Sequence, residues 1–380
     1  MTLDIDFDSA SLDLSSSRIE GARVLLRGHD NHYPGKWKWV HFRLRGCRGR
    51  EVSFELPDSF EPGSDHLERH RMVYSYDGHT WAFFPHNRRQ PARGIYEFTL
   101  GAPFDRDEVF VAYGIPYPAS RVDRMVESMA SSPFVQPTRS ADESFVLGMT
   151  PGGSDAFGRR VPPLPLYGLQ IGEGGPDARR IVLMSGVHPN ETPASHMMEG
   201  MMAFLIDPDH PDAQFVRSHA EVLIYPMVNP EGRFAGYNRG TREYPERDAN
   251  RFWHPDLYGD FLEVRTIAES LKQDLDGPPD YFIDLHSWTD TGRHFGILSR
   301  EDGFHLDPFW LAFRRIEPGV NEEPSNWLNW STETFAFKIL GARFAMTFET
   351  MFVPNMNIDG FHELGRNLGR ALAAGLSARA

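Results

Sequence analysis

The chain has 380 residues, 40% of them hydrophobic, which is enough for the cores of two or three domains. Its formal net charge of −14 argues against a general nucleic-acid-binding or anionic-membrane surface, because both need clustered Lys and Arg. A single cysteine, Cys47, excludes an internal disulfide framework and agrees with a reducing compartment. No apolar run reaches transmembrane length, and the acidic first residues lack the pattern of a secretory signal. We therefore expect a cytoplasmic protein that binds neither nucleic acid nor membranes, while the oligomeric state stays unknown.

Residues 1–117 are predicted to form an antiparallel β-sandwich domain. Short runs of β-forming residues are separated by Gly, Pro, Asn and Asp, and several alternate apolar with polar side chains. Asp77-Gly78, between two of these runs, is typical of a hairpin. The predicted strands cover residues 23–27, 37–44, 51–56, 71–76, 80–84 and 109–113.

Residues 118–380 are predicted to form a second domain of the α/β class. Pro116 and Pro118 end the last strand of the first domain and stiffen the connection. Beyond them, β-type runs alternate with segments of helical spacing near 120–129, 197–205, 261–275 and 364–373. Thr192 and Pro193 suit the start of one helix, with Thr192 as the N-cap. This alternation indicates a mixed sheet covered by helices on both faces, an α/β/α arrangement.

A candidate metal-binding pair follows the apolar run 181–185. His188 and Glu191 are three positions apart, where the run stops at Gly186 and a loop leads into an amphipathic helix. Both side chains can reach one metal ion. A hydrolytic zinc site needs three protein ligands and one open position for water, and two of the three usually lie close together in sequence.

The third ligand is expected from another strand. Residues 281–285 form a strand-type run that leads directly into His286. Ligands of open α/β sheets bind at the carboxyl ends of strands, so His286 is expected to meet His188 and Glu191 at one edge.

Two later segments place further polar groups at or shortly after the ends of strand-type runs. A run at 222–228 leads into Asn229-Pro230-Glu231-Gly232, and Asp248, Asn250 and Arg251 follow. A guanidinium beside an amide matches a carboxylate with paired hydrogen bonds, so Asn250 and Arg251 suit recognition of a free chain end. The run 343–350 places Glu349 near the end of another strand, where it can take a proton from water and return it to a leaving amine.

Taken together, these motifs resemble the zinc metallocarboxypeptidase (funnelin) family. The family order is HxxE, NPDG, an arginine, DxNR, a strand-end His and a TxE glutamate. The corresponding elements of this chain, in the same order, are His188-Pro189-Asn190-Glu191, Asn229-Pro230-Glu231-Gly232, an arginine, Asp248-Ala249-Asn250-Arg251, His286 and Thr347-Phe348-Glu349.

The resemblance implies a role for each of these residues in the chemistry. His188, Glu191 and His286 would bind one zinc ion per chain, and zinc lowers the pKa of a bound water to about 7. Glu349 would be the general base and proton shuttle.

The resemblance also implies how substrate is held. Asn250 and Arg251 would bind the terminal carboxylate of the substrate, and Asp248 would accept a hydrogen bond that orients His188. Arg239 would stabilise the developing oxyanion. Arg242 competes with Arg239 for this role, because the segment between residues 229 and 248 has no fixed length.

A β-sandwich before such a domain is similar to the cytosolic carboxypeptidase subfamily. This likeness implies a zinc carboxypeptidase that acts on the C-terminal tails of peptides or proteins, and it suggests acidic tails such as polyglutamate. Arg343 and Arg293 are the candidates for a cation that would bind such a tail.

Two other functions stay open. One is an N-acyl amino acid deacylase of the succinylglutamate desuccinylase or aspartoacylase type, which resembles the same metal and DxNR pattern. The other is a peptide-tail-binding module without catalysis. The N-terminal β domain and the turn at 229–232 favour the peptidase over the deacylase. The presence of Glu349 beside all three ligands argues against the binding module, which would need no base.

Overall fold

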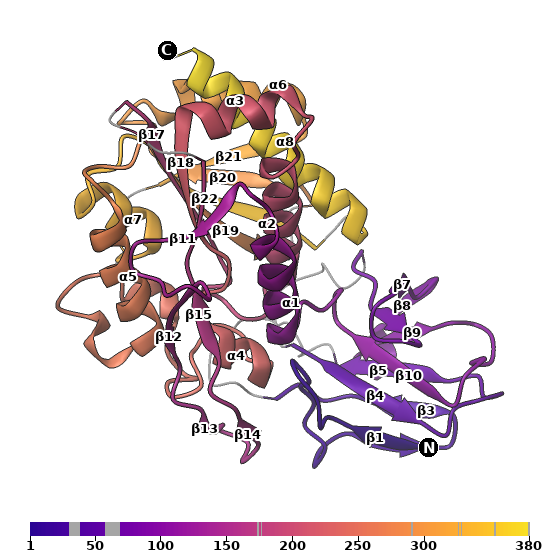
Figure 1. Cartoon of the computed structure of the whole chain (residues 1–380). Coiled ribbons are helices and arrows are strands. Elements are labelled where there is room, and N and C mark those ends of the chain that lie inside the picture. The colour runs from indigo at the N-terminus through magenta and orange to yellow at the C-terminus, as the bar shows by residue number, and fades with distance from the viewer. Residues whose placement is uncertain are drawn as a thin grey trace.

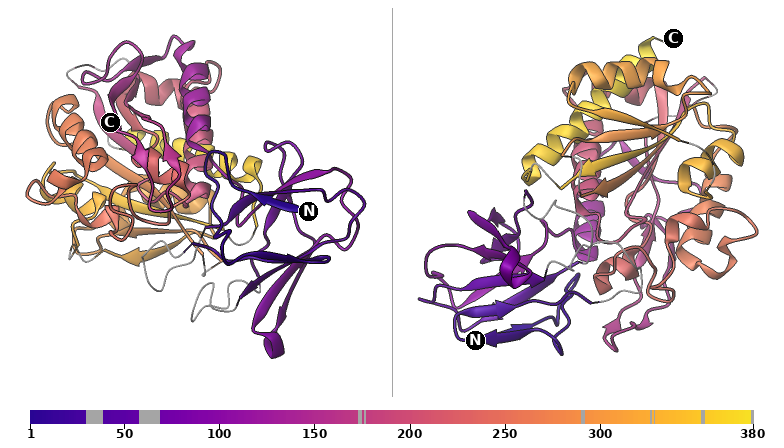
Figure 2. Two further views of the ribbon diagram at one scale, coloured as in Figure 1. Left: turned by 90° about the horizontal axis from the view of Figure 1, so that it is seen from below. Right: turned by 180° about the vertical axis from the view of Figure 1, so that it is seen from behind.

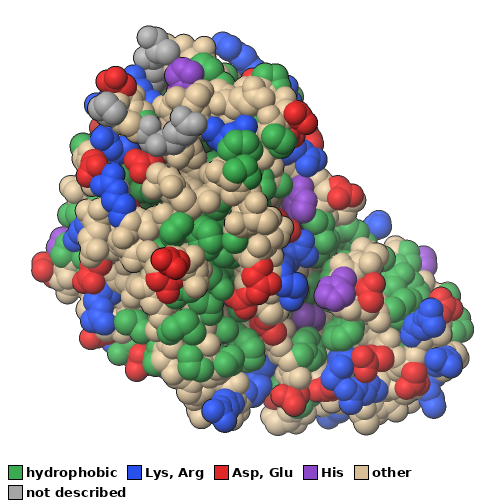
Figure 3. Space-filling model, in the orientation of Figure 1, with side chains coloured by type: hydrophobic (Ala, Val, Ile, Leu, Met, Phe, Trp, Pro, Cys, Tyr) green, Lys and Arg blue, Asp and Glu red, His purple; other side chains and the backbone are tan. Residues whose placement is uncertain are grey.

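The computed structural model describes residues 1–29, 39–57, 69–172, 175, 177–289, 292–325, 327, 329–352 and 355–378. Its two parts lie side by side, a smaller all-β part at the N-terminus and a larger part in which helices surround a sheet (Figures 1 and 2). On the face shown in Figure 3, Lys and Arg side chains are interspersed with Asp and Glu, so neither sign of charge gathers into one large patch there.

Two five-stranded sheets form the N-terminal part. In order across each sheet, the first contains β1 (Thr2–Asp4), β4 (His41–Arg45), β10 (Glu108–Ala112), β6 (Val73–Ser75) and β7 (Ala82–Phe83), and the second contains β2 (Arg18–Glu20), β3 (Arg23–Leu25), β5 (Ser53–Pro57), β9 (Ile95–Thr99) and β8 (His86–Gln90). Neighbouring strands run antiparallel, except that β3 and β5 are parallel.

The two sheets share one apolar core, as a sandwich requires. Phe42 of β4 and Phe54 of β5 pack with ring centroids 5.9 Å apart, and both are fully buried. Six predicted strands match β3, β4, β5, β6, β7 and β10, while β1, β2, β8 and β9 are findings of the structure. Residues 37 and 38 of the second predicted strand lie outside the described residues.

The predicted domain boundary near residue 117 falls between β10 and the first helix, α1 (Ala119–Ala130). Phe352, far along the chain, nevertheless packs into the core of the N-terminal part and lies 5.5 Å from Tyr113, ring to ring. The two parts therefore share apolar contacts, and the boundary stays a prediction.

An eight-stranded mixed sheet forms the centre of the larger part, as predicted. Its order is β11 (Val135–Pro137), β16 (Leu169–Ile171), β18 (Ala220–Tyr225), β17 (Arg179–Ser185), β19 (Tyr281–Trp288), β22 (Ala345–Met351), β20 (Phe295–Leu298) and β21 (Asn321–Pro324). The four strands from β18 to β22 are parallel, so their carboxyl ends lie along one edge. Two small hairpins, β12 (Val146–Met149) with β15 (Pro165–Tyr167) and β13 (Gly153–Ser154) with β14 (Arg160–Val161), lie outside this sheet.

Helices cover both faces of this sheet (Figure 1). One face carries α2 (Thr192–Leu205), α3 (Pro211–His219), α6 (Pro308–Ile316) and α8 (Ile358–Ser377), and the other carries α5 (Leu262–Asp274) and α7 (Thr332–Lys338), while the short α4 (Pro230–Ala235) follows β18. Four predicted helices correspond to α1, α2, α5 and α8. Among the described residues, no helix is both long and apolar enough to cross a bilayer.

Helices α2 and α8 approach each other closely at Gly200. A Cβ atom on Gly200 would lie 2.3 Å from the Cα atom of His362, a distance that real side chains do not tolerate. This close approach places His362 beside His196 and Glu199 of α2.

Candidate active site

The turn after β17 depends on a glycine. Gly186 has φ of +72°, and a Cβ atom there would lie 2.6 Å from the sulfur of Met227. Only glycine fits both the left-handed backbone and the space. The turn carries His188 and Glu191 to the carboxyl edge of the sheet.

Helix α2 begins at Thr192, so its N-cap is Glu191 and not Thr192 as predicted. The Glu191 side chain makes no capping hydrogen bond. It is directed instead at two imidazoles, which explains why the cap rule placed the helix start one residue late.

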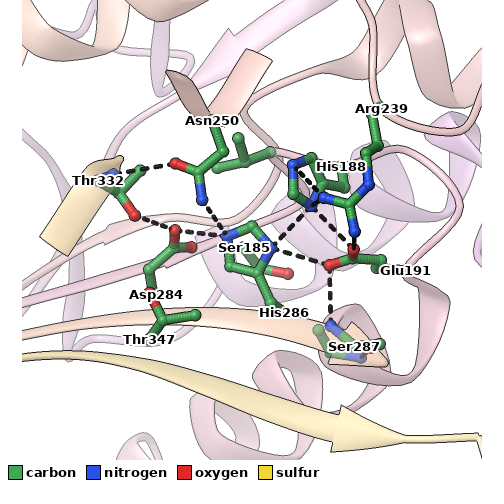
Figure 4. A network of polar contacts seen from close by, with 12 residues as sticks. Ser185, His188, Glu191, Arg239, Asn250, Asp284, His286, Ser287, Thr332 and Thr347 are labelled. Atoms are coloured by element: carbon green, nitrogen blue, oxygen red, sulfur yellow. Dashed lines mark hydrogen bonds and ion pairs between the residues drawn. The ribbon is translucent and has the colours of Figure 1, made fainter. Parts of the chain in front are cut away.

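Three side chains converge at this edge (Figure 4). The Nδ1 atoms of His188 and His286 each lie 2.8 Å from a different carboxylate oxygen of Glu191. They also lie 3.0 Å from each other. The backbone N–H of Ser287 donates to Glu191 Oε2 at 2.8 Å. All three side chains are buried.

A carboxylate holds the other nitrogen of each imidazole. Nε2 of His188 lies 2.9 Å from Asp248 Oδ1, and Nε2 of His286 lies 2.7 Å from Asp284 Oδ2. We assign the ring protons to Nε2, since only that tautomer donates to these carboxylates. Both Nδ1 lone pairs then point at the same small space as the Glu191 carboxylate.

This arrangement fits a zinc ion. Two imidazole nitrogens and one carboxylate are a usual donor set of hydrolytic zinc sites, and carboxylates that accept from the outer N–H are the usual supports. Three acceptors directed at one space repel each other unless a cation or a proton lies between them. His188, Glu191 and His286 would hold the ion.

The ligands and the carboxylates around them change one another's pKa values. Burial alone would raise the pKa of Glu191, but the charges of His188 and His286 hold that pKa well below its usual range. Burial would lower the pKa of His286, yet the charges of Asp284 and Glu191 raise it well above its usual range.

Glu349 lies one strand further along the sheet. It is directly opposite His286 in the parallel pairing of β19 and β22. Burial, and then the negative charge of Glu191, raise the pKa of Glu349 to about 8. A carboxyl group whose surroundings favour proton uptake suits a residue that must accept a proton and later return it.

A cavity of about 380 Å³ opens beside these groups. Its lining includes His188, His286 and Glu349, and also Asn250 and Arg251 from the segment after Asp248. The sequence therefore predicted residues that lie around one space.

Hydrogen bonds to backbone groups hold the side chains of Asn250 and Arg251 in place. Asn250 Oδ1 accepts from the backbone N–H of Thr332 at 2.9 Å, and Arg251 Nη1 donates to the carbonyl of Asn250 at 2.7 Å. The Arg251 side chain is 42% exposed and stays accessible from the cavity.

The two candidate arginines differ in position. Arg239 lines the cavity, with its Nη1 atom 3.0 Å from the ring nitrogens of His188 and its guanidinium over the ring of Trp288. Arg242 does not line the cavity, because its Nε donates to Glu231 at 2.6 Å and its Nη1 to the carbonyl of Ser154.

Three contributors to the site were missed by the sequence reasoning. Asp284 orients His286, Thr332 donates its hydroxyl to Asp284, and Glu333 lines the cavity. Asp284 could have been found, because residues two apart on a strand lie on the same face and Asp284 precedes His286 by two. No sequence signal marked Thr332 or Glu333.

A second group of His and Glu side chains lies in the same domain. Ligand atoms of His196, Glu199 and His362 lie within 4.8 Å of one another. Arg121, however, forms two hydrogen bonds to the carboxylate of Glu199, at 2.8 and 3.1 Å. We assign no metal to this group.

Comparison with known proteins agrees with this geometry. Residues 156–291 match the model of the zinc carboxypeptidase family. Over these residues the chain is similar to zinc carboxypeptidases. The matched residues contain His188, Glu191 and His286, whereas Glu349 lies outside them. The predicted resemblance is thus confirmed.

Relatives of this domain include cytosolic carboxypeptidase 6 of Mus musculus and of Homo sapiens. The mouse protein is 27% identical over 303 residues and the human protein 26% identical over 303 residues, each across 76% of this chain. The alignments cover 53% and 57% of those proteins, so the chain spans about half the length of the curated relatives it matches.

Solved structures show that the fold extends beyond the matched domain. A metallo-carboxypeptidase from Burkholderia cenocepacia aligns with a TM-score of 0.82 at 19% identity, covering 100% of this chain and 99% of that one. A Pseudomonas aeruginosa metallo-carboxypeptidase, solved with (2-guanidinoethylmercapto)succinic acid, aligns with a TM-score of 0.78 at 22% identity and covers 98% of each chain. The zinc carboxypeptidase domain and the N-terminal sandwich together therefore form a known fold.

Proposed function

We propose that this chain is a zinc-dependent carboxypeptidase that hydrolyses the C-terminal peptide bond of peptides or protein tails. The supporting observation is that one cavity is lined by two of the three candidate ligands, a buried carboxylate at a strand end and an amide–guanidinium pair. A hydrolase of internal peptide bonds would have no use for the amide–guanidinium pair. The names of the relatives place those proteins in the cytosol, and we extend this location to the chain as part of the proposal.

Each residue of the site has a separate role in the proposed hydrolysis. A zinc ion held by His188, Glu191 and His286 would supply the positive charge that polarises water and the scissile carbonyl. Glu349 accepts the proton of the attacking water and returns it to the leaving amine. Asp248 keeps His188 in the tautomer whose Nδ1 faces the site.

Positively charged side chains of the cavity bind the negative groups of the substrate. Asn250 and Arg251 hold the terminal carboxylate, because the planar guanidinium and the amide present paired donors to its two oxygens. Arg239, the arginine that lines the cavity, stabilises negative charge on the carbonyl oxygen.

The test compares matched substrates on the zinc-loaded protein. Peptides of several residues with a free C-terminus should lose their last residue, while the same peptides with a C-terminal amide should resist. The lost charge-assisted hydrogen bonds, roughly 1.5 to 3 kcal/mol each, correspond to about 10- to 150-fold in kcat/KM. Arg251→Ala should remove most of the difference between acid and amide, and Arg251→Lys, which keeps the charge without the planar fork, should restore it only in part.

A second substrate panel separates the alternatives. N-acetyl and N-succinyl amino acids should be poor substrates compared with the peptides. Preference for these short acyl amino acids would assign the protein to the deacylases, and binding of peptide tails without release of any product would assign it to the binding modules.

A further inference from the structure

We propose that Glu333 makes the inner end of the cavity selective for a cationic C-terminal side chain, that of lysine or arginine. This inference rests on the proposed carboxypeptidase function, and it names the class of residue that the site removes.

Strand register defines the inner end of the cavity. Thr347 precedes Glu349 by two residues on β22, so both side chains lie on the same face of the sheet, with Thr347 roughly 7 Å further from the strand end. In the antiparallel pairing with β20, Phe295 lies opposite Glu349 and Ile297 lies opposite Thr347. All four residues line the cavity. The cavity therefore extends inward from the metal ligands along this row.

Glu333 supplies the charge at that inner end. It is the second residue of α7, it lines the cavity, and it is 9% exposed. Its Oε2 atom accepts a hydrogen bond from the hydroxyl of Thr347 at 2.8 Å, which fixes the carboxylate above the inner row.

Glu333 has no countercharge among the residues that the structure describes, since no Lys or Arg there forms an ion pair with it. Buried carboxylates are usually paired, because removing a charge from water costs several kcal/mol. The ammonium group of lysine or the guanidinium of arginine on a substrate would provide the missing partner.

The cations of the cavity lie at its other end. Arg251 is 3.7 Å from Asp248, and Arg239 is 3.6 Å from Glu191, so both guanidinium groups are near the metal ligands and the terminal carboxylate of a substrate. A C-terminal residue therefore meets positive charge at its backbone carboxylate and negative charge at the tip of its side chain.

The wall between the two ends suits the stem of such a residue. Phe295 and Ile297 form an apolar surface on β20, along which the methylene groups of lysine or arginine can pack. A terminal glutamate would instead bring its carboxylate toward Glu333, and like charges in a partly dry site repel strongly.

The cations suggested by the sequence for an acidic tail lie elsewhere. Arg343 forms an ion pair with Asp280, at 3.3 Å, before the first residue of β19 and thus at the opposite edge of the sheet. Neither Arg343 nor the exposed Arg293 lines the cavity.

The experiment measures a specificity ratio. Peptides identical except for a last residue of Lys, Arg, Leu or Glu are offered to the zinc-loaded protein, and kcat/KM is determined for each. We expect Lys and Arg to be preferred to Glu, and Glu333→Gln to lower the ratio of Lys to Leu by about 10- to 100-fold, the loss of one charge-assisted contact.

Two variants serve as controls. Glu323→Gln makes the same change at an exposed residue of β21 that does not line the cavity, and its Lys-to-Leu ratio should equal that of the wild type. Glu333→Asp keeps the charge on a shorter stem and should restore part of the ratio lost in Glu333→Gln.

Binding to the Glu349→Gln protein, measured by calorimetry with the same peptides, provides a readout without turnover. If peptides are cleaved but Glu is preferred, or if Glu333→Gln leaves the Lys-to-Leu ratio unchanged, the selectivity inference is wrong and the carboxypeptidase function stands. If no peptide is cleaved but Lys-ending peptides still bind more tightly than Glu-ending ones, the proposed function is wrong and Glu333 keeps its role. Absence of both cleavage and selective binding overturns both.

Discussion

The pair of a histidine and a glutamate three positions apart occurs twice between residues 188 and 199. His188 and Glu191 precede α2 and meet His286, while His196 and Glu199 lie within α2 and meet His362. The donor types are the same, and in both groups the ligand atoms lie within 4.8 Å of one another. Proximity of ligand atoms therefore does not distinguish the two groups.

The surrounding charges do distinguish them. Asp248 and Asp284 accept from the outer nitrogens of His188 and His286, and Glu349 adds a further carboxylate nearby. These negative charges favour a divalent cation and leave both Nδ1 atoms free to bind it.

The second group has the opposite environment. Arg121 forms two hydrogen bonds with Glu199, at 2.8 and 3.1 Å, whereas Arg239 approaches Glu191 only at 3.6 Å. Neither ring nitrogen of His196 forms a hydrogen bond with a carboxylate among the described residues. Burial first, and then the positive charges of Arg121, His362 and Arg233, hold the pKa of His196 well below its usual range. The positive charges of Arg121 and Arg233 likewise oppose a divalent cation at this group. The comparison teaches that two groups with the same donor atoms differ in the charges behind the ligands, which favour a metal ion only in the first group.

The largest expected effect comes from removing one histidine of each group. His286→Ala should lose stoichiometric zinc and nearly all peptidase activity, because only two ligands remain. His362→Ala should keep one zinc per chain and wild-type turnover. Metal content by mass spectrometry after dialysis checks both, and the reverse pattern would exchange the roles of the two groups.

Glu349→Gln tests the proton shuttle apart from metal binding. The amide keeps the shape and cannot accept the proton, so turnover should fall by about 10²- to 10⁴-fold while zinc stays bound. Steady-state kinetics combined with metal analysis makes this measurement. Near-normal turnover would remove Glu349 from the mechanism.

Asp284→Asn tests whether the carboxylates behind the imidazoles contribute to zinc affinity. Replacing this carboxylate weakens the negative field and the hold on the imidazole, so zinc affinity should fall by about 10- to 100-fold. Competition with a chelator of known affinity measures the change. Asp256→Asn is the matched control, because Asp256 faces His254 at 3.6 Å but is 88% exposed. Equal losses in the two variants would contradict the assigned role of Asp284.

The smallest effect concerns the stability of the second group. A buried His196 with a lowered pKa stays neutral in the folded state while the unfolded chain takes up a proton, so stability falls as pH falls below about 6.5. The loss is at most about 1.4 kcal/mol for each pH unit. His196→Phe should lose less stability than the wild type between pH 7 and pH 5 in urea unfolding. His219→Gln, at an exposed histidine of α3, should match the wild type.

Local patterns in the sequence predicted residues that the structure brings together at one edge of the sheet. His188 closely follows one strand-type run, His286 ends a second and Glu349 lies near the end of a third, which predicted that these side chains meet, because parallel strands share one carboxyl edge. Helical spacing and proline placement likewise predicted α1, α2, α5 and α8. The residue types of the DxNR segment further predicted that Asn250 and Arg251 would accompany the ligands, and both line the cavity.

Tertiary structure alone decided the contacts that depend on packing between distant segments. The choice between Arg239 and Arg242 required the path of the loop before Asp248, since spacing along an irregular segment does not fix where a side chain lies. The close approach of α8 to Gly200 created the second His-Glu-His group, and the placement of α7 over β22 brought Glu333 to Thr347. The spacing of hydrophobic residues predicts which face of a helix or strand is apolar. Which helix or strand packs against that face depends on the fold as a whole. The sequence thus determined which polar residues lie at the strand ends, and the packing of helices on the sheet placed Glu333 in the cavity.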